Sequence, residues 1–185
     1  LANAMERAGH EVQMLSDPAE LASFEALIIA VGDARLEATV ELLEPHVHHG
    51  LIVFHTCLSR GVQVLDPLET RGCVVAALAP FALMRWAVTT LDELGETVAE
   101  LNITEFRGEA VALSDAERPS FAARAYYAEM LRRLHISAAV DARFFPSAEE
   151  KPMVGEDMDT EEIIAAYRGA TDPGLRRSYV EVARR

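Results

Sequence analysis

Two runs of the chain, residues 51–54 and 73–78, are apolar at every position. A strand with one face in solvent alternates apolar and polar residues, so short continuous runs predict strands that are buried on both faces. Residues 59–68 between them have helical spacing, and Gly72 marks a turn before the second run. Two buried strands joined by a helix-length connection predict a parallel β-α-β unit.

Similar patterns on either side extend this unit into a larger sheet. Further strands are predicted at residues 12–15, 26–31 and 110–113, and a short extended stretch at 86–89. An amphipathic helix is predicted at 36–47, because apolar residues recur there every three to four positions. Strands that alternate with helices indicate an α/β fold with a doubly wound parallel sheet.

The C-terminal part has a different character. Ser114 and Glu117 form a capping-box pair, which predicts the start of a helix that reaches about residue 140. A proline-containing loop at 144–155 and two short helices follow. The predicted division is an α/β domain over residues 1–113 and a helical segment over residues 114–185.

The predicted sheet lacks its usual beginning. A sheet of this kind normally starts with a strand, a glycine-rich turn and a helix, whereas here only the end of a helix, residues 1–7, precedes Gly9. With the strand order 3-2-1-4-5, the absent strand would lie between 12–15 and 51–54, and its absence would leave backbone groups unpaired. We therefore expect roughly fifteen further residues before Leu1 in the natural protein.

Composition narrows the function. The 185 residues carry a net charge of -13, which argues against nucleic acid and anionic membrane surfaces as partners. No apolar run approaches the roughly 20 residues of a membrane span, and no signal peptide is visible. Cys57 and Cys73 have no metal or redox spacing and sit at predicted buried strands, so we expect reduced core thiols in a cytoplasmic protein.

Four segments in this order resemble a known superfamily. They read LANAMERAGHEVQML, ALIIAVGD, LIVFHTCLSRGVQVLDPLETRGCVVAALAP and AERPSFAARAYYAEML. They are similar to the Rossmann-like domains of the 6-phosphogluconate dehydrogenase-like superfamily, and most similar to small bacterial proteins described as NADP- or F420-dependent oxidoreductase-like dehydrogenases. The resemblance covers residues 1–134.

The resemblance implies a Rossmann-like NAD(P)-binding domain over residues 1–113 and an oxidoreductase that uses NADP or NAD, without identifying the small-molecule substrate. At two positions this sequence departs from the family pattern. The histidine that the family has before its proline is Ala79 here, and its histidine on the long helix is Ala122. The alternative is therefore a non-catalytic Rossmann-like protein that binds a nucleotide for regulation.

Candidate site residues follow from the rule that ligands of parallel sheets bind beyond the carboxyl ends of the strands. After the first predicted strand, Ser16 and Asp17 can hold ribose hydroxyls or a 2′-phosphate; alternatively, Asp17 only caps the next helix. At the end of the following strand come Val31 and Gly32. A glycine there lets the backbone approach a pyrophosphate, but it equally makes a plain turn.

The ends of the two all-apolar strands mark the expected nicotinamide position. His55 is the best candidate for a catalytic acid or base. The alternative is a histidine whose ring is held by backbone groups. The predicted cofactor-binding set is Ser16, Asp17, Val31, Gly32, His55, Thr56 and Pro80.

Two other groups are tempting but have simpler explanations. His46, His48 and His49 lack a carboxylate in register, and histidines at a helix C-terminus interact favourably with the helix dipole. No metal site is therefore predicted. Arg85 and Trp86 can present a cation and an aromatic face to an anionic ligand, or they can belong to the core.

The helix at 121–134 is apolar over more than one face. Besides its core stripe it carries Tyr126, Tyr127, Met130 and Leu134. Such a helix needs a second partner, so we expect a homodimer with this helix and the one at 159–167 at the interface. The alternative is a monomer in which the last two helices cover that surface.

Overall fold

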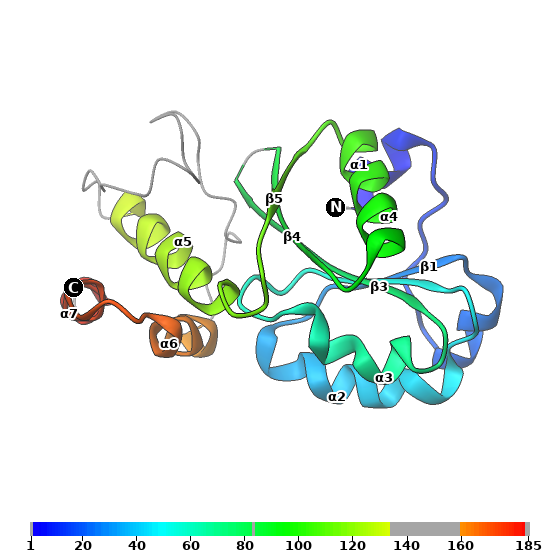
Figure 1. Ribbon diagram of the computed structural model, residues 1–185, viewed down its shortest axis with the longest axis horizontal. Helices are drawn as coiled ribbons and strands as arrows, with labels where there is room; N and C mark the ends of the chain where they lie inside the picture. The colour runs from blue at the N-terminus through cyan, green and yellow to red at the C-terminus, as the bar shows by residue number, and fades with distance from the viewer. Residues whose placement is uncertain (1, 83, 134–159, 184–185) are drawn as a thin grey trace.

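The computed structural model describes residues 2–82, 84–133 and 160–183, and in this part of the chain five strands form one sheet (Figure 1). Their order in the sheet follows the chain: β1 (Ala26–Ile29), β2 (Ile52–His55), β3 (Val74–Ala82), β4 (Arg85–Thr90) and β5 (Glu109–Ala112). β1, β2 and β3 are parallel, β4 is antiparallel to β3, and β5 is parallel to β4.

Helices surround this sheet. They are α1 (Ala2–Ala8), α2 (Asp33–Leu43), α3 (Asp66–Glu69), α4 (Glu93–Glu105), α5 (Arg118–Arg133), α6 (Thr160–Gly169) and α7 (Pro173–Ala183), with short 3-10 turns η1 (Pro18–Ser23), η2 (Glu44–His46) and η3 (Val62–Leu65). In Figure 1, α2 and α3 lie below the sheet, α1 and α4 lie above it, and α5 to α7 gather at one side.

Neighbouring residues of β2 explain why both faces of the sheet are covered. Side chains alternate between the two faces of a strand. Val53 packs in the cluster that contains Leu36 of α2, whereas Phe54 packs in the cluster that contains Ile103 of α4. The strands predicted from the all-apolar runs pair in parallel, with Ile52 opposite Val74. The predicted α/β fold is therefore confirmed.

The predicted place of the missing strand is wrong. Residues 12–15 form no strand, and Met14 is 85% exposed. β2 pairs directly with β1, with Ala26 opposite Ile52, so no gap separates β2 from its neighbour. The local pattern at 12–15 is extended, but a strand also needs a hydrogen-bonded partner, and no described strand lies beside this segment.

β3 continues past Pro80, where the sequence pattern predicted its end. β2 stops at His55, opposite Ala77, so beyond that point β3 pairs only with β4. The register shifts between Pro80 and Ala82. A proline is tolerated at such a place because its missing N–H faces no second strand. The hairpin makes the sheet mostly rather than wholly parallel.

The C-terminal helices cover each other. The helix predicted from Ser114 is present as α5, while residues 134–159, with the predicted loop at 144–155, lie outside the described residues. Tyr127 of α5 stacks on Tyr179 of α7 at a ring-centroid distance of 6.0 Å. A Cβ added at Gly169 of α6 would lie 2.6 Å from the Pro119 carbonyl oxygen, so α5 and α6 approach closely.

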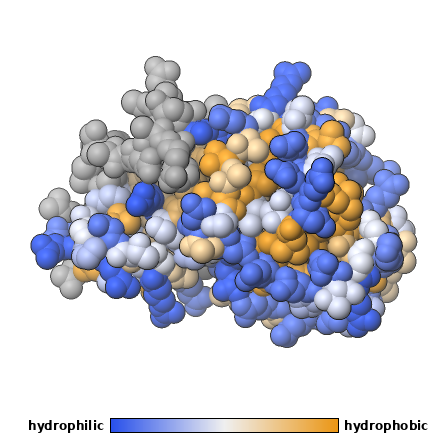
Figure 2. Space-filling view, viewed as in Figure 1, coloured by the Kyte–Doolittle hydropathy of each residue, from blue (hydrophilic) through white to orange (hydrophobic). Residues whose placement is uncertain are grey.

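Figure 2 shows apolar surface on the face of the molecule to which α4 belongs. Leu94 and Leu101 of this helix are 57% and 60% exposed.

Among the described residues, no helix combines the length and the apolar character that a membrane crossing requires.

Candidate functional site

The carboxyl end of β1 leads through Val31 and Gly32 into α2. Gly32 is the N-cap residue of α2, and no side chain caps that helix end. A Cβ at Gly32 would lie 3.0 Å from the Glu162 Oε1 atom of α6. The glycine therefore lets a carboxylate from the C-terminal helices lie directly against the backbone at the end of β1.

The ring of His55, at the end of β2, is completely buried. Its Nε2 atom lies 2.9 Å from the Gly61 carbonyl oxygen, and its Nδ1 atom accepts the Cys57 N–H at 3.2 Å. Because a carbonyl only accepts, Nε2 carries the hydrogen and the ring is neutral. Burial lowers the pKa of His55 to about 4. This arrangement argues against His55 as an acid or base. Its ring instead stabilises the loop after β2 through hydrogen bonds to two backbone groups.

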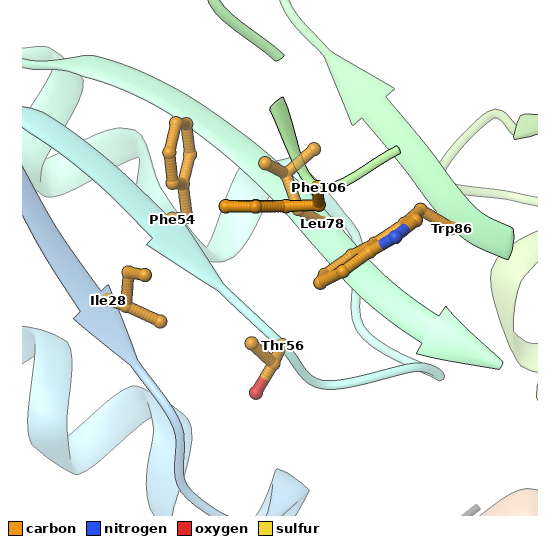
Figure 3. A pocket seen from close by; sticks show the side chains of 6 residues that line it. All are labelled: Ile28, Phe54, Thr56, Leu78, Trp86 and Phe106. Atoms are coloured by element: carbon orange, nitrogen blue, oxygen red, sulfur yellow. The ribbon is translucent and has the colours of Figure 1, made fainter. Parts of the chain in front are cut away.

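Thr56 lies at the edge of a small apolar pocket (Figure 3). Its N–H donates to the Ile29 carbonyl oxygen at 3.2 Å, and its side-chain oxygen points away from the aromatic rings. The pocket has a volume of about 10 Å³, which is room for one water molecule. This volume is too small for a ring-sized ligand.

Trp86 and Arg85 belong to the sheet rather than to an open site. Trp86 is buried and packs against Phe106 at a ring-centroid distance of 5.5 Å. Arg85 is also buried, 3.4 Å from a carboxylate oxygen of Glu109. The core interpretation of this pair is the one that the packing supports.

Side chains from the loop after β2 tie it to the end of β1. The Cys57 Sγ atom donates to the Val31 carbonyl oxygen at 3.1 Å, and the Ser59 hydroxyl donates to the Asp33 carboxylate. Burial, followed by the charge of Asp33, raises the pKa of the Cys57 thiol, so it stays protonated and is not a nucleophile.

Tyr126 of α5 and Glu162 of α6 add a second hydrogen-bonded pair at the same place. The buried Tyr126 hydroxyl donates to Glu162 Oε2 at 3.2 Å. Burial, and then the charges of Glu162 and Asp33, raise the pKa of this phenol, so it is a donor at all ordinary pH values. The strand-end cluster, as we name it, consists of Gly32, Asp33, Cys57, Ser59, Tyr126 and Glu162.

Arg118, the first residue of α5, is completely buried and anchors the loop after β2. Its guanidinium lies within hydrogen-bond distance of six oxygen atoms, those of Thr89 Oγ1 and the carbonyls of Cys57, Leu58, Arg60, Ala77 and Ala87. Burial lowers the pKa of Arg118 to about 10, so the group remains charged at neutral pH.

Asp115 fixes the other end of the same loop. Its carboxylate accepts the N–H groups of Val62 at 2.9 Å and Gln63 at 3.1 Å, and so caps η3. Sequence reasoning missed Asp115 and Arg118. For Arg118, its position could have served as a signal. A cation at a helix N-terminus interacts unfavourably with the helix dipole, so its presence there indicates that the side chain makes contacts elsewhere in the fold.

Ser16, Asp17 and Pro80, which the sequence also predicted as site residues, are not part of the strand-end cluster. Ser16 and Asp17 are exposed, and Asp17 caps η1 by accepting the Ala19 N–H at 2.9 Å. In the described part of the chain, neither of them has a hydrogen bond to the strand-end cluster. Pro80 lies within β3, beyond the end of β2.

Among the histidines after α2, His48 has two backbone partners. The His48 ring nitrogens lie 3.0 Å from the Phe24 carbonyl oxygen and 3.1 Å from that of His49. These carbonyls raise the pKa of His48. Within the described residues, no group of three or more histidine, cysteine, aspartate or glutamate side chains is placed to hold a metal ion.

A larger groove of about 440 Å³ lies along α4 and β5. Its lining includes the carboxylates of Glu96, Glu100 and Glu117. The groove does not lie at the carboxyl ends of β1 and β2, where ligands of parallel sheets bind. It is therefore a poorer candidate than the strand-end cluster.

Comparison with known proteins agrees with the fold described above. The family model for the Rossmann-like domain matches residues 15–80. The chain is also similar to the structure of a conserved hypothetical protein from Sinorhizobium meliloti, with 14% identity, a TM-score of 0.53, and coverage of 91% of this chain and 69% of that one. For the arogenate dehydrogenase from Synechocystis the identity is 11%, the TM-score 0.50, and the coverage 91% and 69%.

A third similar structure is the prephenate dehydrogenase from A. aeolicus in complex with hydroxyphenyl propionate and NAD+, with 12% identity and a TM-score of 0.47. The alignment covers 92% of this chain and 66% of that one. A separate alignment, with the 3-hydroxybutyryl-CoA dehydrogenase from Escherichia coli, covers only 28% of that protein. No curated protein sequence matches the chain. At these identities the likeness concerns the fold, and together with the matched segment it shows that the chain contains a Rossmann-like domain.

Proposed function

We propose that the protein is an NAD(P)-dependent oxidoreductase that moves a hydride to or from a small substrate. The observation that carries this proposal is the meeting of the β1 and β2 ends. Ile29 and His55, the last residues of these parallel strands, are register partners, and Gly32, just beyond β1, is only partly buried. In Rossmann-like folds, dinucleotides bind across this edge.

The cofactor-binding residues divide into two groups under this proposal. Val31, Gly32 and Thr56 line the nicotinamide half, because they follow β1 and β2 directly. Ser16 and Asp17 hold the adenosine ribose. His55 shapes the loop from inside, since both of its ring nitrogens are engaged.

The cofactor would supply a two-electron acceptor or donor at its nicotinamide ring. In the oxidative direction, a C–H bond of the substrate breaks and its hydrogen leaves with both electrons, while the O–H or N–H proton of the same substrate passes to a base. In this scheme the Glu162 carboxylate, whose Oε1 atom lies beside Gly32, accepts that proton. The Tyr126 hydroxyl keeps its hydrogen bond to Glu162 Oε2 and so holds the carboxylate in position.

Calorimetric titration of the full-length protein with NAD and NADP tests the proposal. We expect one nucleotide to bind in the micromolar range. Gly32→Leu should weaken binding at least tenfold, because its side chain would project toward Glu162 Oε1. The matched control is Ala38→Leu, at an exposed position further along α2, which should leave the affinity unchanged. Absence of binding of either nucleotide at millimolar concentration would refute the proposal.

The homodimer expected from the sequence loses its main support. The second apolar face of α5 packs against Ala166 of α6, Tyr179 of α7 and Ala170 between these helices. We keep the oligomeric state as a proposal to be tested by sedimentation at micromolar concentration. A single monomer-sized species would reject the dimer.

A further inference from the structure

β5 ends the sheet on one side and leaves backbone groups there unpaired. In the described part of the chain, β4 is its only neighbouring strand. Glu109 and Leu113 donate their N–H groups to carbonyl oxygens of the β4 segment at 2.6 and 2.8 Å. Backbone groups of successive residues point to opposite sides of a strand, so those of Ala110 and Ala112 point away from β4. Both alanines are exposed, and no hydrogen bond joins these outward groups to another described residue.

The β5 edge lacks the devices that usually prevent pairing with another chain. Proline, a bulge or charged side chains commonly protect an exposed strand edge. β5 contains no proline, its register with β4 is continuous, and three of its four residues are apolar and small or medium-sized. An extended segment can therefore pair with this edge as a further strand.

The groove of about 440 Å³ along α4 and β5 decides which chemistry such a segment needs. Ala110 and Ala112 line this groove together with Glu96 and Glu100 of α4. Both glutamates are exposed, and among the described residues neither carboxylate has an ion-pair partner. They lie one helix turn apart, so a cation in the groove is attracted by both. The groove therefore favours lysine or arginine side chains.

The two faces of β5 have different surroundings, and this difference specifies the pattern of the added strand. Ala110 and Ala112 face the groove, whereas Val111 packs against the cluster that contains Phe121 of α5. Side chains of an added strand alternate in the same way. Every second residue of that strand would lie on the groove side, beside the glutamates, and the residues between would lie beside Val111.

We propose that the β5 edge binds an extended segment of a partner protein, with lysine or arginine at alternate positions and apolar residues between them. The outward backbone groups of Ala110 and Ala112 form the hydrogen bonds, and Glu96 and Glu100 select for the cations. A second copy of this chain is a poor occupant, because its net charge of -13 opposes approach to an acidic groove. The interaction goes beyond the proposed function and needs no nucleotide, since β5 and β1 lie at opposite ends of the sheet.

Fluorescence anisotropy of the full-length protein without nucleotide tests this inference. The probe is a labelled peptide in which lysine and valine alternate, and we expect it to bind in the micromolar range. Two control peptides should bind at least about tenfold more weakly. One has glutamate in place of lysine, and the other has the same composition as the probe but its lysines in one block.

Removal of the two groove charges should weaken binding of the probe. We expect at least about a fivefold loss of affinity when Glu96→Gln and Glu100→Gln are combined. The matched control combines Glu41→Gln and Glu69→Gln, which remove the same charge from exposed positions of α2 and α3. It should leave the affinity unchanged, because salt screens charges that lie far from the groove.

Ala112→Pro tests the strand edge without a change of charge. Proline has no N–H, and its ring would occupy the place of an outward donor while the hydrogen bonds to β4 remain. Binding should fall at least about tenfold, with the midpoint of urea unfolding nearly unchanged. If this variant does not fold, the Glu96 and Glu100 pair and the peptide controls decide.

Three results would overturn the inference. The first is no binding of the lysine–valine peptide at millimolar concentration. The second is equal binding to the unaltered protein and to the variant without the groove charges, because net charge alone would then attract the peptide. The third is self-association in sedimentation that Ala112→Pro removes, since a second copy would then occupy the edge.

Discussion

The Arg118 Nη2 atom donates a 2.7 Å hydrogen bond to the carbonyl oxygen of Ala77, which joins the first turn of α5 to the middle strand of the sheet. The same guanidinium reaches Thr89 in β4 and the Cys57 carbonyl after β2. One buried side chain therefore fixes the C-terminal helices, the sheet and the loop that borders the candidate site.

Replacement of Arg118 should be costly even by lysine. Lysine keeps the charge but has three donors on a single nitrogen, so it cannot replace the hydrogen bonds that Arg118 donates from three separate nitrogens. Each buried carbonyl left without a donor costs about 1–3 kcal/mol. We expect Arg118→Lys to lower the free energy of unfolding by at least about 3 kcal/mol in urea titrations. Arg35→Lys, at an exposed position of α2, should change it by less than about 0.5 kcal/mol. Equal values for the two variants would contradict the anchoring role.

Gly61 and Asp115 should be energetically coupled. A Cβ at Gly61 would lie 2.1 Å from the Asp115 carboxylate, so Gly61→Ala must displace the group that caps η3. Loss of such a cap costs about 1–2 kcal/mol. In an Asp115→Ala background the obstacle is gone, and the same glycine replacement should cost almost nothing more. Additive effects in this double-mutant cycle would disprove the coupling.

His55 should make the protein less stable in mild acid. The folded ring has a pKa of about 4, below the ordinary histidine value of 6.5. Between these values the unfolded chain binds the extra proton, so the free energy of unfolding falls as the pH drops from 6.5 to 4. The loss from this residue is on the order of 3 kcal/mol.

Urea titrations at several pH values check this expectation. His55→Gln keeps a donor toward the Gly61 carbonyl but does not titrate, so it should flatten the dependence between pH 6.5 and 4, although it is less stable at pH 7. His46→Gln, at an exposed position, should leave the slope unchanged. A slope that persists in His55→Gln would show that other groups cause it.

The parallel core of the fold could be predicted because its signal is local. Continuous apolar runs at β2 and β3 require burial on both faces, and His55 and Thr56 follow from the end of β2. Residues 12–15 also have a local strand pattern, but strand formation depends on a partner that the pattern does not contain.

The rest of the site could not be predicted because its contacts are distant in the sequence. Arg118 contacts residues that lie 29 to 61 positions away, and Tyr126 meets Glu162 across 36 positions. The apolar character of Tyr126 suggested an interface between subunits. Its hydroxyl, which determines its role, has no periodicity that a sequence pattern can detect.

Hydrogen–deuterium exchange of the full-length protein, with and without saturating NAD or NADP, tests the central claim most directly. The claim is that a dinucleotide binds across the carboxyl ends of β1 and β2. We expect bound nucleotide to slow exchange in peptides that cover residues 29–35 and 55–61, with no change along α4. Slowed exchange confined to the groove of Glu96, Glu100 and Glu117, or no change anywhere in the chain, would contradict it.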